Sequence, residues 1–123
     1  MAVFTVTTAH PDGEGWNTHV KSHVDYLLTL IEEGRLKASE PLRGTKLRSG
    51  FMIFSADDRA EVESIIANDP FAIEGLIAEL VITEWDPLFG AFHDVSSMQR
   101  MPREQADGSA QRNLRPKTNR KQV

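Results

Sequence analysis

Residues 16–34, WNTHVKSHVDYLLTLIEEG, form a long, well-bounded helical pattern that organises the rest of the chain. The large aliphatic residues of this stretch recur at Val20, Val24, Leu27, Leu28 and Ile31. This spacing places them on one stripe of an α-helix, and Gly34 follows where a helix end favours a left-handed residue. The pattern therefore predicts a helix that begins near Trp16 and ends at Glu33.

Strands are predicted on both sides of this helix. Residues 2–8, AVFTVTT, are β-branched or aromatic after Ala2, which is typical of a strand, and Pro11-Asp12-Gly13 then predicts a turn. Residues 36–42 are short and mixed, and they predict a strand with the character of a sheet edge that ends near Pro41.

The order of strand and helix then repeats. Residues 44–50 predict a hairpin loop, and residues 51–54, FMIF, are a continuous apolar run typical of a buried strand. Asp57 or Asp58 can cap the helix that follows. The residues expected on the buried face of that helix are Val62, Ile65 and Ile66.

A short helical turn and a last strand complete the body of the chain. Asp69-Pro70 has the form of an N-cap followed by proline at the first helical position, and Gly75 ends the turn that this start predicts. Residues 77–85 predict a strand, because polar and aliphatic side chains alternate along much of their length.

The predicted order of elements is strand, helix, strand, strand, helix, strand, which is that of the α+β ferredoxin-like plait. Both helices would then lie on one face of a four-stranded antiparallel sheet. The residues expected on the other face are Phe4 or Val3, Met52 or Ile53, and Leu80 or Val81. Because soluble monomers avoid a large bare apolar face, we expect a homodimer or higher homo-oligomer in which two sheets pack together.

The composition excludes several classes of protein. The chain has 123 residues and no cysteine, which fits one domain and excludes disulfides and thiolate chemistry. No apolar stretch approaches about 18 residues, and residues 1–5 have neither the basic nor the apolar region of a secretion signal. We therefore expect a cytoplasmic protein with no membrane partner.

The charge is distributed unevenly along the chain. Residues 1–90 hold 7 Lys/Arg against 15 Asp/Glu, a net charge of −8, whereas residues 91–123 hold 7 against 3, a net charge of +4. An acidic body argues against a nucleic-acid groove. We expect one folded domain over residues 1–90 and a basic polar tail over residues 91–123. The tail has too few large apolar residues to form a core, so we expect it to be disordered or packed on a neighbouring subunit.

His23 and Asp69 are the candidate pair for proton transfer. In the predicted plait their elements lie on the same face of the sheet, so the carboxylate can fix the tautomer of the imidazole and raise its basicity. The residues alone favour simpler roles, a half-buried core histidine and an ordinary helix cap. His19 and His23 could share a metal ion, but Val20 stands where the metalloprotease motif needs glutamate, and no third ligand is evident. We expect no metal and no cofactor.

Other side chains near this pair are candidates for holding a small substrate. Tyr26 and Ser39 are hydroxyl donors, and Ser39 has no triad context that would make it a nucleophile. Arg43, Lys46 and Arg48 at the hairpin could hold an anion, although basic residues in a loop are usually just solvated. No glycine-rich phosphate loop or nucleotide fingerprint is present.

Several short motifs occur in an order typical of one family. They are His23 with Tyr26-Leu27, Leu30, Glu33-Gly34-Arg35-Leu36, Pro41-Leu42, Asp69-Pro70-Phe71, Gly75-Leu76 and Trp85. Together they resemble the YciI-like (YCII-related) family over roughly residues 1–88, and the tail lies outside the resemblance.

The resemblance implies a dimeric α+β barrel, similar in fold to muconolactone isomerase, with a His-Asp active site at His23 and Asp69. Some members of the family act as dehydrochlorinases on chlorinated hydroxyaromatic compounds, and most have no assigned reaction. The family usually has Gly-Pro after the second strand, where this chain has Glu40-Pro41. The glutamate adds bulk and charge near the pocket, or supplies a second acid. The candidate substrate-binding residues are therefore Tyr26, Ser39, Glu40 and Arg43.

Two functions stay open at this point. The first is a cofactor-free lyase or isomerase that acts on a small oxygenated ring or enol compound. The second is a non-catalytic module for small-ligand binding or assembly, in which His23 and Asp69 form a structural hydrogen bond. An enzyme needs a concave pocket open beside His23, whereas a pair sealed under side chains favours the structural role.

Overall fold

The computed structural model of the protein describes residues 1–97, apart from the side chain of Glu40. The chain divides into two compact units, Met1–Trp85 and Asp86–Val123, and each is described by itself. In the described part of the second unit, a 3-10 turn, η1, spans His93–Val95. Most of the predicted tail lies outside the described residues, so its order and packing stay predictions.

The first unit has the order of elements that the sequence predicts. The elements are β1 (Ala2–His10), α1 (Gly15–Glu32), β2 (Leu36–Leu42), β3 (Arg48–Ala56), α2 (Arg59–Ala67), α3 (Pro70–Ile73) and β4 (Glu79–Trp85). The Asp58 side chain caps α2 by accepting a hydrogen bond from the backbone N–H of Glu61. Gly34 follows α1 with a φ of 78°, a left-handed conformation that costs glycine little.

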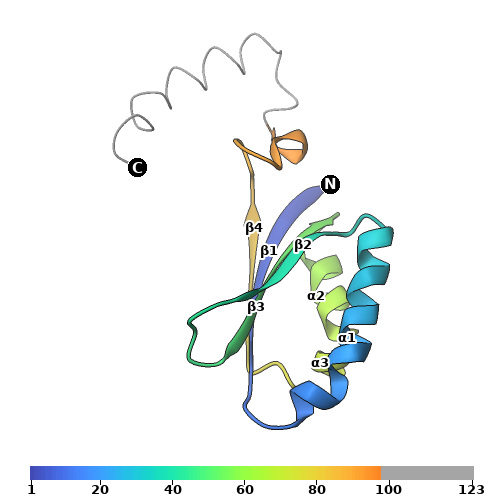
Figure 1. Cartoon of the computed structure of the whole chain (residues 1–123). Helices are drawn as coiled ribbons and strands as arrows, with labels where there is room; N and C mark the ends of the chain where they lie inside the picture. The colour runs from blue at the N-terminus through green and yellow to red at the C-terminus, as the bar shows by residue number, and fades with distance from the viewer. Residues whose placement is uncertain (98–123) are drawn as a thin grey trace. The chain divides into compact units, whose positions relative to one another are not determined.

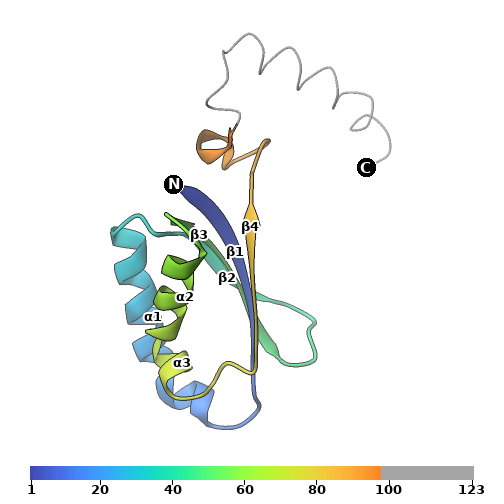
Figure 2. The same ribbon diagram turned by 180° about the vertical axis from the view of Figure 1, so that it is seen from behind.

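The four strands form one sheet in the order β2-β3-β1-β4, and all neighbouring strands are antiparallel. Figures 1 and 2 show the sheet from opposite sides, and in both views α1, α2 and α3 lie on the same face of it. This arrangement is the α+β ferredoxin-like plait that the sequence predicts.

The register between β1 and β3 decides what lies beneath the helices. Along the helix-facing side, the cross-strand pairs are Ala2 with Ala56, Phe4 with Phe54, Val6 with Met52, Thr8 with Gly50, and His10 with Arg48. The first three pairs belong to the hydrophobic core or pack against it, whereas the last two line a cavity. The helix-facing surface of the sheet is therefore apolar at one end and polar at the other.

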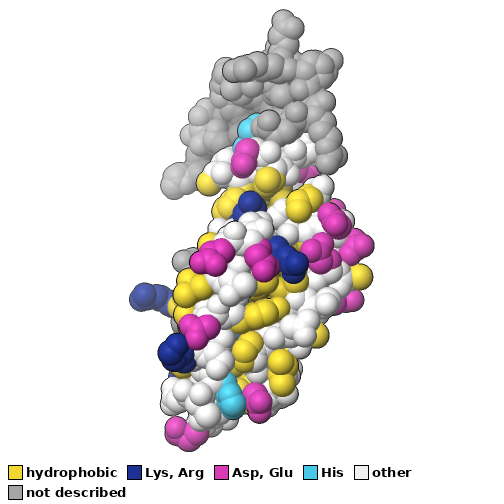
Figure 3. Space-filling model, turned by 90° about the vertical axis from the view of Figure 1, so that its right-hand side faces the viewer, with side chains coloured by type: hydrophobic (Ala, Val, Ile, Leu, Met, Phe, Trp, Pro, Cys, Tyr) yellow, Lys and Arg dark blue, Asp and Glu magenta, His cyan; other side chains and the backbone are white. Residues whose placement is uncertain are grey.

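The core contains the three aliphatic residues predicted for α2, which are Val62, Ile65 and Ile66. The stripe predicted for α1 is buried only in part, because Leu27 packs against the core but other members are exposed. Leu30 is the buried residue of α1, whereas Leu28 and Ile31 are 52% and 50% exposed. Hydrophobic side chains are accordingly visible on the helical face in Figure 3. The helix is rotated so that His23, Tyr26 and Leu30 face inward, and Leu28 and Ile31 of the predicted stripe lie on the exposed side.

Several strand boundaries differ from those predicted. β1 runs to His10 instead of ending at residue 8, β3 begins at Arg48 instead of at residue 51, and β4 begins at Glu79 instead of at residue 77. Pairing with a neighbouring strand extends β1 and β3 beyond their apolar residues, because the backbone hydrogen bonds do not depend on side-chain type. The extension places His10 and Arg48 in the sheet and opposite each other.

Candidate active site

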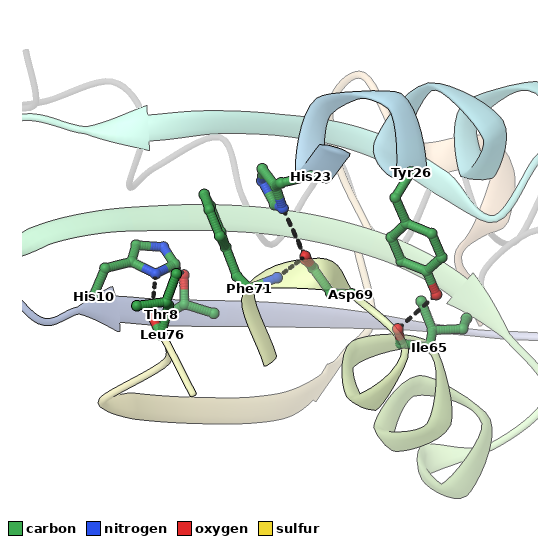
Figure 4. Close-up of polar contacts among 8 residues, drawn as sticks. All are labelled: Thr8, His10, His23, Tyr26, Ile65, Asp69, Phe71 and Leu76. Atoms are coloured by element: carbon green, nitrogen blue, oxygen red, sulfur yellow. Dashed lines mark hydrogen bonds and ion pairs between the residues drawn. The ribbon is translucent and has the colours of Figure 1, made fainter. Parts of the chain in front are cut away.

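His23 and Asp69 are 46 residues apart in the sequence and in direct contact in the fold. Nδ1 of His23 lies 2.9 Å from both carboxylate oxygens of Asp69 (Figure 4). A carboxylate accepts hydrogen bonds, so Nδ1 carries the hydrogen and donates it. This tautomer leaves Nε2 of His23 with a lone pair, which forms no hydrogen bond with any described residue. An imidazole held in this way is ready to accept a proton at Nε2.

The carboxylate of Asp69 accepts hydrogen bonds from both His23 and the start of α3. Its Oδ1 also accepts a hydrogen bond of 2.9 Å from the backbone N–H of Phe71, which caps α3. The carboxylate is 4% exposed and the imidazole of His23 is 16% exposed. The capping role and the orienting role that the sequence analysis set against each other are therefore both present in the structure.

The ring of Phe71 lies between two histidines (Figure 4). It stacks on the imidazole of His23, with ring centroids 4.1 Å apart, and meets the imidazole of His10 edge to face at 4.9 Å. Phe71 is almost fully buried, so the packing of α3 against β1 and α1 fixes its ring. Both imidazoles therefore rest against a rigid apolar wall.

His10 is also held in a single tautomer. Its Nδ1 lies 2.7 Å from the backbone oxygen of Leu76, to which it donates a hydrogen bond. The lone pair is then at Nε2, which lies 3.4 Å from Oγ1 of Thr8, at the outer limit of a hydrogen bond. The ring is 7% exposed and forms part of the cavity lining.

A cavity of about 340 Å³ opens between α1, the sheet and α3. Its polar or charged lining residues are Thr8, His10, His23, Ser39, Arg48 and Ser49. The remaining lining residues are Trp16, Val20, Val24, Leu27, Pro41, Gly50, Met52 and Phe71. A mostly apolar wall with a few polar groups is typical of sites for small organic ligands.

Arg48 lies where the cavity meets the N-terminal end of α1. Its guanidinium carbon is 3.9 Å from the centre of the Trp16 ring, which is a cation–π contact. No carboxylate of the described residues forms an ion pair with Arg48. The guanidinium is therefore held in place by an aromatic face, with its hydrogen-bond donors available for an anion.

Tyr26 ties α1 to α2 instead of facing the cavity. Its hydroxyl donates a hydrogen bond of 2.7 Å to the backbone oxygen of Ile65. Burial raises the pKa of the Tyr26 phenol above its ordinary value, and the negative charge of Asp69 raises this pKa further. The phenol therefore keeps its proton through neutral pH and stays a donor to Ile65.

The structure gathers some of the predicted site residues and separates others. His23 and Asp69 are together, and Ser39 lines the same cavity as His23. Tyr26 and Arg43 are not among the residues that line it. Glu40 lies in β2, but its side chain is outside what the structure describes, so its role stays a prediction.

Two cavity residues, Trp16 and His10, were not identified as site residues in the sequence, whereas Arg48 was one of three hairpin cations considered for holding an anion. Trp16 was treated only as the start of a helix, and His10 was given no role. The available signal was the alternation along β1, in which Phe4 and Val6 share a face with Thr8 and His10. Where the strand residues that face the core are followed, on the same face, by polar residues, a ligand-binding site is indicated.

No three residues of the metal-binding types lie close enough to hold an ion within residues 1–97. His19 lies 3.8 Å from a carboxylate oxygen of Glu74, and His23 contacts Asp69. No helix in the described part of the chain is long and apolar enough to cross a membrane.

The fold and the site define a ferredoxin-like α+β protein in which a carboxylate-bound histidine faces an apolar cavity. The sequence profile of the YCII-related domain family matches residues 1–86, and the chain belongs to this family. This confirms the resemblance that the sequence motifs indicated.

Solved structures that are similar to this chain have low sequence identity to it. 5-chloro-2-hydroxyhydroquinone dehydrochlorinase (TftG) from Burkholderia phenoliruptrix AC1100, in complex with 2,5-dihydroxybenzoquinone, is 23% identical, with a TM-score of 0.61 over 74% of this chain and 97% of that chain. An uncharacterised NIPSNAP domain protein from Burkholderia xenovorans is 20% identical, with a TM-score of 0.49 over 75% and 97% of the two chains. No curated protein matches the sequence.

Proposed function

We propose that the protein is a cofactor-independent enzyme of the lyase or isomerase type that acts on a small oxygenated ring or enol compound. One observation carries the proposal: Asp69 binds Nδ1 of His23, and the same imidazole lines an open cavity of about 340 Å³. A pair sealed under other side chains would favour a structural hydrogen bond, and this pair is not sealed, because His23 lines the cavity.

His23 has the role of general base in this proposal. Its Nε2 takes a proton from a substrate hydroxyl or from a carbon beside a carbonyl, and Asp69 stabilises the imidazolium that forms. The hydroxyl of Ser39 and the guanidinium of Arg48 line the cavity and are the candidate donors to an oxyanion. Tyr26 is not assigned this role, because its hydroxyl donates to the backbone of Ile65.

The cavity size and the structural neighbour both fit a ligand with one ring. A volume of about 340 Å³ lies within the range of sites for small organic ligands, and its stacked aromatic residues suit a flat compound. The neighbour with a TM-score of 0.61 is a dehydrochlorinase whose structure contains 2,5-dihydroxybenzoquinone. Chlorinated and unchlorinated hydroxyquinols are therefore the first compounds to assay.

The test compares three variants on a panel of these compounds. We expect His23→Ala to lower turnover about 10²–10⁴-fold, which is the usual contribution of a general base. Asp69→Asn should also lower turnover, because the amide presents a donor to Nδ1 and favours the tautomer with hydrogen on Nε2. His19→Ala is the matched control, because His19 lies one turn away on α1 and is absent from the cavity lining.

Unchanged turnover in folded His23→Ala would contradict the proposal. Binding of a panel compound by the wild type without any turnover would instead favour the alternative, a non-catalytic ligand-binding module. Circular dichroism of each variant shows whether the loss of turnover comes from unfolding.

We also propose that two subunits pack through the sheet face that lies away from the helices. Because Phe4 and Val6 face the core, the alternation of β1 places Val3 on the opposite face, with Ile53 and Val81 on the neighbouring strands. In the single chain Val81 is 58% exposed, whereas Val3 and Ile53 are already buried, so the open part of this face lies around Val81. Light scattering at micromolar concentration should give twice the mass of 13.8 kDa.

A charged residue on this face should separate the subunits. We expect Val81→Arg to give a monomer, whereas Leu28→Arg on the exposed side of α1 should leave the dimer intact. A monomeric wild type at micromolar concentration would contradict the dimer.

A further inference from the structure

We propose that His10 and Arg48 form a second polar subsite of the cavity, which binds a ligand hydroxyl and a neighbouring oxyanion. The inference rests on the proposed function, because it specifies the chemistry of the compound that the same cavity takes. The two residues are cross-strand partners on β1 and β3, and both line the cavity.

His10 supplies a hydrogen-bond acceptor. Its Nδ1–H is committed to the backbone oxygen of Leu76 at 2.7 Å, so Nε2 is left to accept. The hydroxyl of Thr8 is 3.4 Å away, a distance at which a ligand hydroxyl would compete easily. An acceptor of this kind favours a ligand O–H and disfavours an ionised oxygen at the same position.

Arg48 supplies donors and positive charge. Its guanidinium is placed 3.9 Å from the centre of the Trp16 ring, so it is oriented before any ligand arrives. The planar group donates to oxyanions through charge-assisted hydrogen bonds. Because Arg48 has no ion-pair partner among the described carboxylates, its charge is not already neutralised.

The sheet brings the acceptor and the donors side by side. Directly opposite residues of an antiparallel pair have Cβ atoms about 4.5–5.5 Å apart. A ligand that carries O–H and O⁻ on adjacent atoms can therefore contact both side chains at once. The ionised form of a vicinal diol on an aromatic ring, or of an enediol, has this arrangement.

The position of the subsite relative to His23 follows from Phe71. The Phe71 ring contacts His10 on one side and stacks on His23 on the other (Figure 4). A ring compound that spans the cavity from His10 to His23 would bring its diol to His10 and Arg48 and a different atom to Nε2 of His23. The subsite would therefore select and orient the substrate, while His23 moves the proton.

The experiment measures the binding of two coloured probes, 4-nitrocatechol and 4-nitrophenol, by absorption titration at a pH where both are monoanions. The probes share the oxyanion and differ by the neighbouring hydroxyl. We expect the wild type to bind 4-nitrocatechol about tenfold more tightly, as one hydrogen bond to a buried acceptor would give.

Three variants separate the two halves of the subsite. His10→Asn keeps a donor near Leu76 and loses the acceptor at Nε2, so the preference for 4-nitrocatechol should disappear. Arg48→Gln should weaken both probes about tenfold or more, because both carry the oxyanion. Lys46→Gln removes a hairpin cation that is absent from the cavity lining, and it should change neither affinity.

Equal wild-type affinities for the two probes, a preference that survives in His10→Asn, or an Arg48→Gln effect no larger than that of Lys46→Gln would overturn the proposal. If His10→Asn does not fold, Thr8→Val decides instead, because it removes the competing hydroxyl and should strengthen the preference. The titration requires no turnover. An intact preference together with turnover that does not depend on His23 would therefore overturn the proposed function alone.

Discussion

Phe4 and Phe54 pair across β1 and β3 at one end of the sheet, and His10 and Arg48 pair across the same two strands at the other end. The first pair lies in the hydrophobic core. The second pair lines the cavity. Five residues of β3 separate Phe54, which stabilises the fold, from Arg48, which lines the cavity. The backbone of the two strands is equally regular at both ends. The side chains alone decide whether a position packs in the core or lines the cavity.

Truncating a side chain should lower the free energy of unfolding far more at the core end of the sheet than at the cavity end. Phe54 is completely buried, so Phe54→Ala removes a large apolar surface and leaves a cavity. We expect the free energy of unfolding to fall by about 3–5 kcal/mol, measured by urea denaturation. A loss below about 1 kcal/mol would show that the packing at this end is loose and would remove the contrast between the two ends.

Asp69 lies at the cavity end but is also a helix cap, so its removal should have an intermediate effect. Asp69→Ala loses the hydrogen bond to the Phe71 N–H and leaves the Nδ1–H of His23 unpaired. We expect a loss of about 2 kcal/mol in the free energy of unfolding. Asp69→Asn is the matched control, because asparagine also caps helices, and its loss should be less than about 1 kcal/mol. Equal losses in the two variants would mean that the cap contributes little.

The contribution of Tyr26 to the free energy of unfolding should depend on pH. Tyr26→Phe removes the hydrogen bond to Ile65, and we expect a loss of about 1 kcal/mol at pH 7. The folded phenol has a pKa above the ordinary 10.0, so above about pH 10 the unfolded chain releases this proton while the folded chain keeps it. The Tyr26 contribution is therefore complete at neutral pH and is lost as the pH rises above about 10.

The measurement is the difference in unfolding free energy between wild type and Tyr26→Phe at several pH values. This difference should shrink above about pH 10, because only the wild type carries the phenol. A difference that stays constant at high pH would contradict the raised pKa.

Arg48 should matter least for stability. The side chain is exposed and its contact with Trp16 is a surface cation–π contact. We expect Arg48→Gln to change the free energy of unfolding by about 0.5 kcal/mol, although the same variant should weaken ligand binding strongly. Thermal unfolding beside the probe titration checks both statements. A loss similar to that of Phe54→Ala would mean that the cavity end stabilises the fold as the core end does.

Much of the fold was predictable because its signals are local. Asp58, Asp69-Pro70 and Gly34 mark helix ends through chemistry that depends on the nearest backbone, and FMIF marks a buried strand by itself. The order of elements then leaves few topologies open. The aliphatic stripe of α1 misled the prediction in part, because the helix turns His23 and Tyr26 inward and leaves Leu28 exposed.

The candidate site was predictable only in part. His23 and Asp69 were found because family motifs surround both residues. Arg48 was considered only as a hairpin cation that could hold an anion. Its pairing with His10 was not predicted, because the pairing depends on the register of two strands, and register is not visible in either strand alone. Trp16 positions the guanidinium of Arg48, and this role is visible only in the folded structure.

The double use of the Asp69 carboxylate has an evolutionary consequence. Asparagine at this position would keep the α3 cap, and a single-base change converts an aspartate codon into an asparagine codon. Such a chain would fold and resist heat like its parent, while its histidine would carry hydrogen on the wrong nitrogen. Selection for stability alone therefore cannot preserve the site. Active and inactive proteins of this fold would differ at residue 69 and not in their architecture.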